Sequence, residues 1–373
     1  MKTQLLSIMM QALGAEKHGE WRDVLELCSL PRPVPSPNEC LVRVAFADVN
    51  PVDLQKLGQN KGQAVSRDPP MVPGYAGSGI IVERGESVPS EFVTGSRVAF
   101  LVNPTHAQKG AYAEYCAVDH RAMAMVHARV TLQSAAVVPL AGCTAYESLV
   151  KLGLGPGTDV SALSSPNKPK VLIVGGAGGV GSWAILLLQA WHASKIEIIA
   201  TASSKESKAW CESLDTQQSL CCIGHDDIAT LGGGPNGSVD YILCLTEPKA
   251  PLFEGLSEAI KPRGCICLVG SGPSLQSLNV GFCFFKSCSL QCETVFSSFR
   301  TNFAHVQPST EIAAVLALME SGKIATAPLS PALAKVECDW TNLRGKEEKT
   351  VLDLISGGHT QGKLCMAITK EFA

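Results

Sequence analysis

The feature that most constrains this chain is a glycine-rich loop between an apolar strand and a helix. Residues 171–174 read Val-Leu-Ile-Val, and glycines at 176, 178 and 181 follow them before the apolar helical run 182–192. This G-x-G-x-x-G spacing suits a tight turn, a close approach of the backbone to a pyrophosphate, and close packing of helix on strand. The N–H groups that open the helix would hold the pyrophosphate. The sequence therefore predicts a dinucleotide site on this loop, made by Gly176, Ala177, Gly178, Gly179, Val180 and Gly181.

The residues beyond the loop continue an alternation of strands and helices. Strands are expected at 197–202, 221–223, 240–245 and 265–269, and helices at 204–214 and 252–260. This order predicts an α/β domain with a doubly wound parallel sheet and helices on both faces. Residues 10–120 instead read as short strands broken by turns, and they predict a β-rich domain. A helix over 135–152 would join the two, and helices at 310–321 and 346–356 and a strand at 363–369 would close the chain.

The end of the second strand indicates which dinucleotide binds. An NAD enzyme places an acidic residue there to hold the ribose 2′-hydroxyl. Here the strand ends in Ala-Ser-Ser-Lys at 202–205, with Lys208 one turn later and no carboxylate at the strand end. Hydroxyl and ammonium groups suit a 2′-phosphate, so the sequence predicts NADPH, held by Ser203, Ser204, Lys205 and Lys208. Ser204 can also serve as the N-cap of the following helix.

Composition excludes several other classes of protein. The net charge of −3 argues against a nucleic-acid surface. The apolar runs are too short to span a membrane, and no leader pattern opens the chain, so a cytoplasmic protein with no membrane partner is expected. The 15 cysteines lack the short regular spacing of zinc sites. We expect them to be reduced, with Cys265 and Cys267 buried in an apolar strand.

Several further motifs occur in a characteristic order along the chain. They are the runs at 49–53, 73–79, 139–146, 259–264 and 362–364, together with the glycine loop. In this order the chain resembles the medium-chain dehydrogenase/reductase superfamily. It is most similar to the zinc-free quinone oxidoreductase branch and to proteins labelled zinc-type alcohol dehydrogenase-like. The resemblance implies a GroES-like catalytic domain at 1–137 and 291–373 with a Rossmann NADPH-binding domain inserted at 138–290.

The resemblance also bears on metal binding. Zinc-dependent relatives carry ligands where this chain has Asn50, Tyr75 and Leu140, and none of these side chains is a customary zinc ligand. No metal is therefore expected. Without a Lewis acid, oxidation of simple alcohols loses its main means of activating the hydroxyl. Hydride transfer from NADPH to a quinone or an α,β-unsaturated carbonyl is the expected chemistry.

The same resemblance implies the roles of individual residues. Asn50 and Thr144 match positions that border the nicotinamide, where Asn50 would donate to an oxyanion and Thr144 would fix the nicotinamide or its ribose. Tyr75 would either donate a proton or form a wall of the pocket, and Asp53 is expected to cap a turn or helix. The remaining predicted cofactor contacts are His225, Val269, Gly270 and Lys363.

Two alternative functions stay open at this point. An enoyl-thioester reductase is disfavoured because residues 54–64 contain no Tyr, which such relatives use shortly after the Asn-Pro motif. A non-catalytic NADPH-binding protein is the alternative of another class. The aromatic-rich stretch 282–305 suggests pocket walls or a subunit contact, and a homodimer is expected.

Overall fold

The chain folds into two units. A computed structural model describes residues 9–65, 70–105, 109–162, 167–232, 236–270, 272–335, 340–342, 349–358, 360–369 and 371. The first unit comprises Met1–Leu140 and Phe296–Ala373, and the second comprises Ala141–Val295. The sequence prediction sets the corresponding boundaries after residues 137 and 290.

The second unit is built on a six-stranded sheet in the order β10-β9-β8-β11-β12-β13. Its strands are β8 (Lys170–Val174), β9 (Glu197–Thr201), β10 (Leu220–Ile223), β11 (Val239–Cys244), β12 (Ile260–Leu268) and β13 (Ser289–Cys292). Every neighbouring pair is parallel. The chain extends the sheet from β8 to one side and then from β11 to the other. The glycine loop follows β8, which lies at this switch point, where open parallel sheets bind their ligands.

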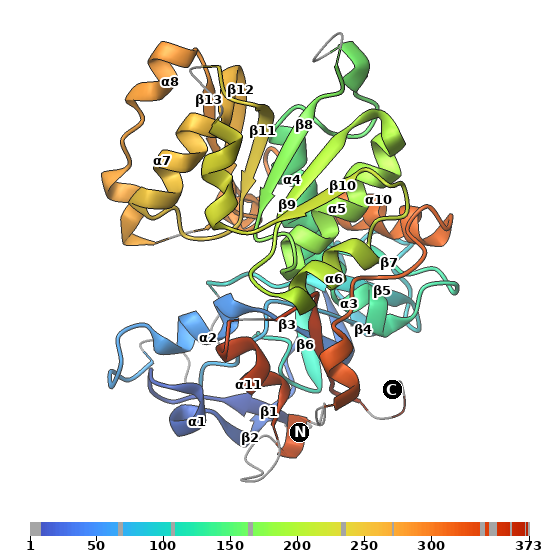
Figure 1. Cartoon of the computed structure of the whole chain (residues 1–373). Coiled ribbons are helices and arrows are strands. Elements are labelled where there is room, and N and C mark those ends of the chain that lie inside the picture. The colour runs from blue at the N-terminus through green and yellow to red at the C-terminus, as the bar shows by residue number, and fades with distance from the viewer. Residues whose placement is uncertain are drawn as a thin grey trace, which may run out of the picture. The chain divides into compact units, whose positions relative to one another are not determined.

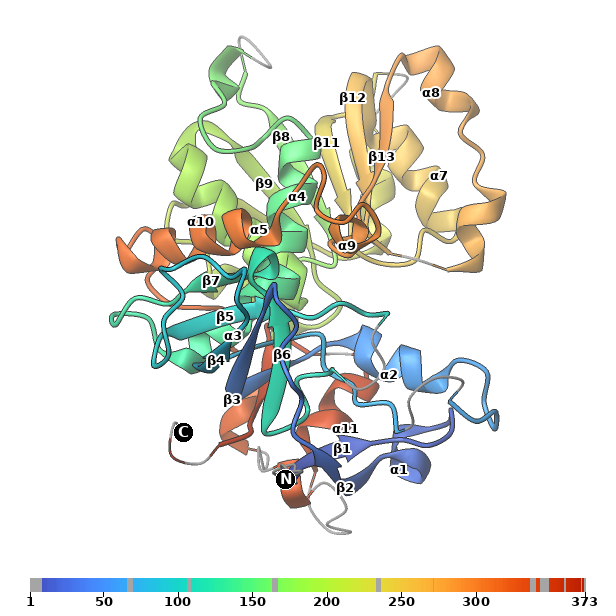
Figure 2. The same cartoon turned by 180° about the vertical axis from the view of Figure 1, so that it is seen from behind.

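Helices cover both faces of this sheet. They are α4 (Cys143–Lys151), α5 (Gly179–His192), α6 (Lys205–Ser213), α7 (Ala250–Ala259) and α8 (Gly281–Lys286). Figure 1 shows α7 in front of the β11–β12 side of the sheet, and Figure 2 shows α4 over the opposite face. Because both faces are covered, Val171–Val174 in the central strand are all fully buried, as a continuous apolar strand requires. The predicted doubly wound α/β domain is confirmed.

The first unit is rich in β-strands, as predicted (Figure 1), and its strand pairs are antiparallel. They are β1 (Met9–Gly14), β2 (Glu26–Pro31), β3 (Glu39–Val49), β4 (Ala76–Arg84), β5 (Arg97–Leu101), β6 (Tyr115–Asp119), β7 (Met123–Met125) and β14 (Leu364–Ala367). One sheet has the order β14-β3-β4-β5-β7, with β6 also paired to β3, and β1 pairs with β2. Leu364 in β14 stands opposite Val49 in β3. The end of the chain therefore completes the domain that its beginning starts.

Short helices connect and flank these strands. They are α1 (Trp21–Val24), α2 (Pro51–Gly58), α3 (Leu132–Ala136), α9 (Ser297–Arg300), α10 (Pro308–Glu320) and α11 (Val351–Ser356). The sequence prediction missed α2, which begins at Pro51 directly after β3 and Asn50. Proline suits this first helical position, where its missing N–H would have no partner in the helix.

Two expected elements differ from the structure. The helix expected over 135–152 is divided into α3, a π-helical turn over Val138–Gly142, and α4. Pro139 lacks the N–H that a continuous α-helix needs, which accounts for the irregular turn. The helix expected over 346–356 begins at Val351, and residues 346–348 lie outside the described part of the chain. The aromatic-rich stretch 282–305 contains most of α8 and all of β13 and α9.

Two further findings concern membrane spans and cysteines. Within the described ranges, none of the helices has both the length and the apolar character needed to cross a bilayer. The described cysteines are all free thiols. Cys267 is fully buried in β12, while Cys265 is only partly covered.

Candidate active site

The glycine loop of the second unit shows why its glycines are needed. A Cβ added to Gly176 would lie 2.6 Å from the Cβ of Ala200 in β9, and one added to Gly181 would lie 2.5 Å from the carbonyl oxygen of Gly175. These two glycines are therefore required by packing. A Cβ at Gly178 would meet only the Gly175 oxygen, at 3.5 Å. Gly178 thus leaves open space, where a ligand can approach the backbone.

The backbone N–H groups of the loop divide into two sets. Gly175 donates to Thr201 Oγ1 at 2.9 Å, Gly176 donates to the Thr201 carbonyl at 3.1 Å, and Gly178 donates to the Gly175 carbonyl at 3.2 Å. Gly179 and Val180 open α5, whose N-cap Gly178 has no side chain to accept from them. Their N–H groups have no acceptor within the described residues. The first turn of α5 can therefore receive an anion.

The end of β9 carries hydroxyl and ammonium groups. The Ser204 hydroxyl accepts from the Ser207 N–H at 3.1 Å, so Ser204 is the N-cap of α6, as predicted. Lys205 is exposed and has no ion-pair partner in the part of the chain that the structure describes. Lys208 lies 3.9 Å from Glu212 on the exposed face of α6. This end of the strand thus presents Ser203, Ser204 and Lys205 to solvent.

Thr201 connects the glycine loop to His225. Its Oγ1 accepts from the Gly175 N–H and lies 3.2 Å from His225 Nε2. One hydroxyl therefore ties the start of the glycine loop to the imidazole ring of His225. The sequence prediction did not include Thr201 among the site residues. A hydroxyl at the end of a buried apolar strand was the feature that could have indicated it.

Three other predicted contacts also belong to the second unit. Val269 donates its N–H to the Cys244 carbonyl at 2.9 Å, and a Cβ on Gly270 would lie 2.3 Å from the Thr246 oxygen. The chain after β12 therefore runs closely beside the chain after β11. Thr144, the second residue of α4, is buried, and its carbonyl accepts from the Ser148 hydroxyl at 2.7 Å. The cofactor contacts of Thr144, Val269 and Gly270 stay predictions.

The first unit contains a buried polar network around Asn50. The Lys363 ammonium lies 2.9 Å from Asp48 Oδ1, 2.5 Å from Asn50 Oδ1 and 3.3 Å from the Val49 carbonyl oxygen. Asn50 Nδ2 donates to Asp48 Oδ2 at 3.0 Å. Asp48, Asn50 and Lys363 are each less than 5% exposed. Lys363 therefore forms an ion pair with Asp48 and hydrogen bonds with Asn50 and Val49, all within the first unit, and its predicted cofactor contact stays a prediction. Asp48 was missed from the sequence, although it is an acid inside the apolar strand β3.

Asp53 anchors the start of α2 beside this network. Its Oδ2 accepts from the Asn50 N–H at 2.8 Å and from the Tyr112 hydroxyl at 3.0 Å. Burial raises the pKa of Asp53 to about 7, against the effect of the Asn50 N–H. Burial also raises the pKa of Asp48, which Lys363 and Asn50 counteract. The expectation that Asp53 caps a turn or helix is confirmed.

Tyr75 combines a packed ring with an available hydroxyl. It is 4% exposed, and its ring meets that of Phe296 edge-on at 5.6 Å. Burial, and then the charge of Asp53, raises the pKa of Tyr75, so the phenol stays protonated. The hydroxyl has no hydrogen-bond partner among the residues described. A phenol of raised pKa is a poor proton donor in catalysis. Because it keeps its proton, the Tyr75 hydroxyl can still donate a hydrogen bond, and the structure favours this role over proton transfer.

The three positions where a zinc ligand would be expected are in the first unit. Asn50, Tyr75 and Leu140 offer an amide, a phenol and an alkyl group. Across the described ranges, no group of three or more His, Cys, Asp or Glu side chains is placed to hold a metal ion.

Several known proteins are similar to this chain. The alcohol dehydrogenase GroES-like domain family matches residues 36–128. A zinc-type alcohol dehydrogenase-like protein of Staphylococcus epidermidis is 31% identical over 66% of this chain and 69% of its own length. The 2-methylene-furan-3-one reductase of Solanum lycopersicum is 33% identical over 45% of this chain and 42% of its own. The quinone oxidoreductase of Coxiella burnetii superposes with a TM-score of 0.73 at 22% identity, covering 97% of this chain and 100% of that one.

Proposed function

Because the chain belongs to the medium-chain dehydrogenase/reductase superfamily and is an oxidoreductase, we propose that it reduces a quinone or an α,β-unsaturated carbonyl with NADPH and without a metal ion. The observation that carries the proposal is the set of side chains at the three positions of the zinc ligands. Asn50 and Tyr75 bear hydrogen-bond donors and Leu140 bears none, so oxygen can be stabilised by hydrogen bonds but not by a bound cation. The similarity to a reductase of a methylene-furanone supports this acceptor class.

The glycine loop fits a dinucleotide. When bound, NADPH supplies the hydride. The N–H groups of Gly179 and Val180 would receive the pyrophosphate in the space that Gly178 leaves open. The 2′-phosphate would meet Ser203, Ser204 and Lys205, where charge and hydroxyl donors coincide.

NADPH is expected to bind at least tenfold more tightly than NADH, a difference of about 1.4 kcal/mol. Changing Lys205 to Glu should remove most of this preference, because a carboxylate repels a 2′-phosphate and can accept from a 2′-hydroxyl. The measurement is a fluorescence titration of each cofactor. Lys249→Glu is the matched control, since Lys249 is an exposed lysine of the second unit that lies, like Lys205, at the start of a helix, as the N-cap of α7. Equal wild-type affinities for the two cofactors would rule out the assignment.

The first unit supplies the groups that stabilise the acceptor. A quinone or enone oxygen gains negative charge as hydride arrives, and a donor aimed at that oxygen acts mainly in the transition state. Tyr75 is the better placed donor, because its hydroxyl has no described partner. Asn50 already donates one amide N–H to Asp48 and has a second to offer.

Tyr75→Phe should lower kcat roughly tenfold with little change in KM, because it removes the hydroxyl while keeping the ring against Phe296. Steady-state oxidation of NADPH with para-quinones and conjugated enones measures the effect. Asn50→Ala should also lower kcat, but this change opens the buried network, so thermal unfolding must be followed in parallel. Full kcat in Tyr75→Phe would show that another group stabilises the oxygen.

Two controls separate this chemistry from its alternatives. Dialysis against a strong chelator should leave activity unchanged, and ethanol should not be oxidised. Loss of activity together with stoichiometric zinc would instead identify a zinc dehydrogenase. Tight NADPH binding without turnover of any quinone or enone would identify a non-catalytic binding protein.

A further inference from the structure

The first unit contains a cavity of about 380 Å³ away from the Asn50 network. It lies where the start of β3, the residues after β5, the 3₁₀ turn His120–Ala122 after β6, and the segment around α9 meet. Its lining includes the charged residues Glu39, Lys109, Asp119 and Arg121 and the aromatic residues Phe299 and Phe303. We propose that this cavity binds a small aromatic monocarboxylate. The inference does not depend on the proposed reaction.

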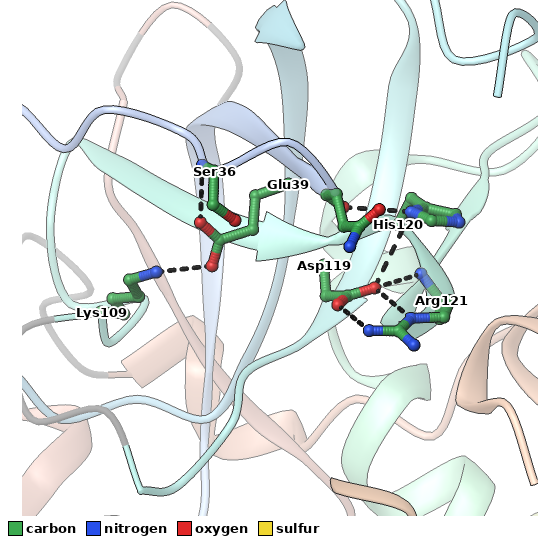
Figure 3. A network of polar contacts seen from close by, with 7 residues as sticks. Ser36, Glu39, Lys109, Asp119, His120 and Arg121 are labelled. Carbon is green, nitrogen blue, oxygen red and sulfur yellow. Dashed lines mark hydrogen bonds and ion pairs between the residues drawn. The ribbon is translucent and has the colours of Figure 1, made fainter. Parts of the chain in front are cut away.

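The acidic groups of the cavity already have donors. Glu39 Oε2 accepts from the Ser36 N–H at 2.9 Å, and Glu39 Oε1 is 2.5 Å from Lys109 Nζ. Asp119 Oδ1 accepts from both the N–H and the Nε of Arg121 at 2.9 Å, and Asp119 Oδ2 accepts from Nη2 at 2.6 Å. Figure 3 shows these two carboxylates, each held by its own cation. A ligand therefore finds few acceptors open to it.

The donors of the cavity are only partly used. Arg121 Nη1 forms no hydrogen bond within the described part of the chain, and Lys109 has further N–H groups beyond the one that faces Glu39. Asn103 Oδ1 accepts from both the N–H and the hydroxyl of Thr105, at 3.0 and 2.8 Å, and the Asn103 amide N–H groups have no acceptor among the described residues. The cavity therefore offers hydrogen-bond donors, while its own carboxylate acceptors are already occupied. This combination favours a ligand that carries oxygen acceptors.

The charge balance of the lining disfavours a ligand with two negative charges. The two cations and the two carboxylates that line the cavity cancel, so the lining has no net positive charge to balance a phosphate dianion, and a ligand with one negative charge meets less repulsion. Glu39 and Asp119 would repel such a dianion more strongly than a single carboxylate. The oxygen of a monocarboxylate can instead accept a charge-assisted hydrogen bond from Nη1 of Arg121.

The aromatic residues that line the cavity suit a ligand with an aromatic ring. The Arg121 guanidinium lies 4.3 Å from the centre of the Phe303 ring, and the rings of Phe299 and Phe303 meet edge-on at 5.2 Å. Asn302 and Phe303 have φ of 48° and 62°, which costs energy for residues other than glycine. This turn nevertheless holds Phe303 beside the guanidinium. A flat ring placed against Phe299 and Phe303 would bring its carboxylate towards Arg121.

The probe is 2-naphthoate, compared with the neutral 2-naphthamide of the same shape, by calorimetric titration of the full chain. We expect saturable binding of naphthoate and at least tenfold weaker binding of the amide. Asn103→Asp should weaken naphthoate roughly tenfold by placing a carboxylate in the cavity while keeping the acceptor for Thr105. Arg121→Gln should weaken it at least as much.

Arg129→Gln is the matched control, because Arg129 is an exposed arginine of the same unit outside the cavity. If Arg121→Gln does not fold, the affinity of Asn103→Asp for naphthoate still tests the proposal. The proposal is overturned if naphthoate shows no saturation up to about 10 mM. It is also overturned if the amide binds equally well, or if Asn103→Asp leaves naphthoate affinity unchanged.

Discussion

Replacing Lys363 by methionine is expected to lower the stability of the first unit by about 3–5 kcal/mol, the usual cost of removing one partner of a buried ion pair. Lys363 is 4% exposed and Asp48 is fully buried, so the variant leaves a carboxylate without its cation. The variant also leaves Asn50 Oδ1 without the hydrogen bond that it accepts from Lys363 in the wild type. Urea denaturation followed by fluorescence or by hydrogen exchange measures the loss.

The pH dependence of this effect has a definite sign. Burial already raises the pKa of Asp48, and loss of Lys363 should raise it further. The folded variant then retains a proton that the unfolded chain releases above about pH 4, so the variant loses stability as pH rises through that window. The deficit relative to the wild type should therefore be small near pH 4 and large at neutral pH. A deficit that does not vary with pH would contradict this account.

Two further variants isolate the ion pair. Lys323→Met removes a lysine that is exposed in the same unit and should change stability little. Asp48→Asn combined with Lys363→Met removes both charges and should recover part of the loss, because the uncompensated charge is then absent. A double variant as unstable as Lys363→Met would assign the loss to packing instead.

The sequence predicted best those parts whose cause is local. The strand at 171–174, the loop and the helix after it follow from neighbouring residues, and the structure has each of them. The π-helical turn before α4 and the helix α2 were missed for a shared reason. Pro139 and Pro51 are both compatible with a helix boundary, and only the packing of the surrounding segments decides what each proline does.

The polar network of the first unit could not be predicted from neighbouring residues in the sequence. Lys363 and Asn50 are separated by 313 positions in the chain, and they meet because β14 pairs with β3. A resemblance can mark both residues as important, but it does not state that they contact each other. Thr201 and Tyr112 were missed similarly, since each acquires its role from a partner brought close by the fold.

The last expected result concerns the glycine loop. Gly178→Asp should weaken binding of the dinucleotide by about 100-fold or more, roughly 2.7 kcal/mol, without lowering thermal stability. Gly178 has φ −71° and ψ 173°, which other residues adopt freely, and an added Cβ meets only ordinary contacts. Asp is a preferred N-cap and should stabilise α5. Its charge would, however, occupy the space where the pyrophosphate approaches the N–H groups of Gly179 and Val180.

The comparison with two other variants makes this test specific. Gly178→Asn has nearly the same shape and capping ability without the charge, so it should lose much less affinity than Gly178→Asp. The difference between them measures repulsion of an anion. Gly181→Ala should lower affinity and thermal stability together, because its Cβ would lie 2.5 Å from the Gly175 carbonyl oxygen and force α5 away from β8. If Gly178→Asp bound the cofactor as tightly as the wild type, the pyrophosphate would not lie on this loop, and the assignment of the dinucleotide site would fail.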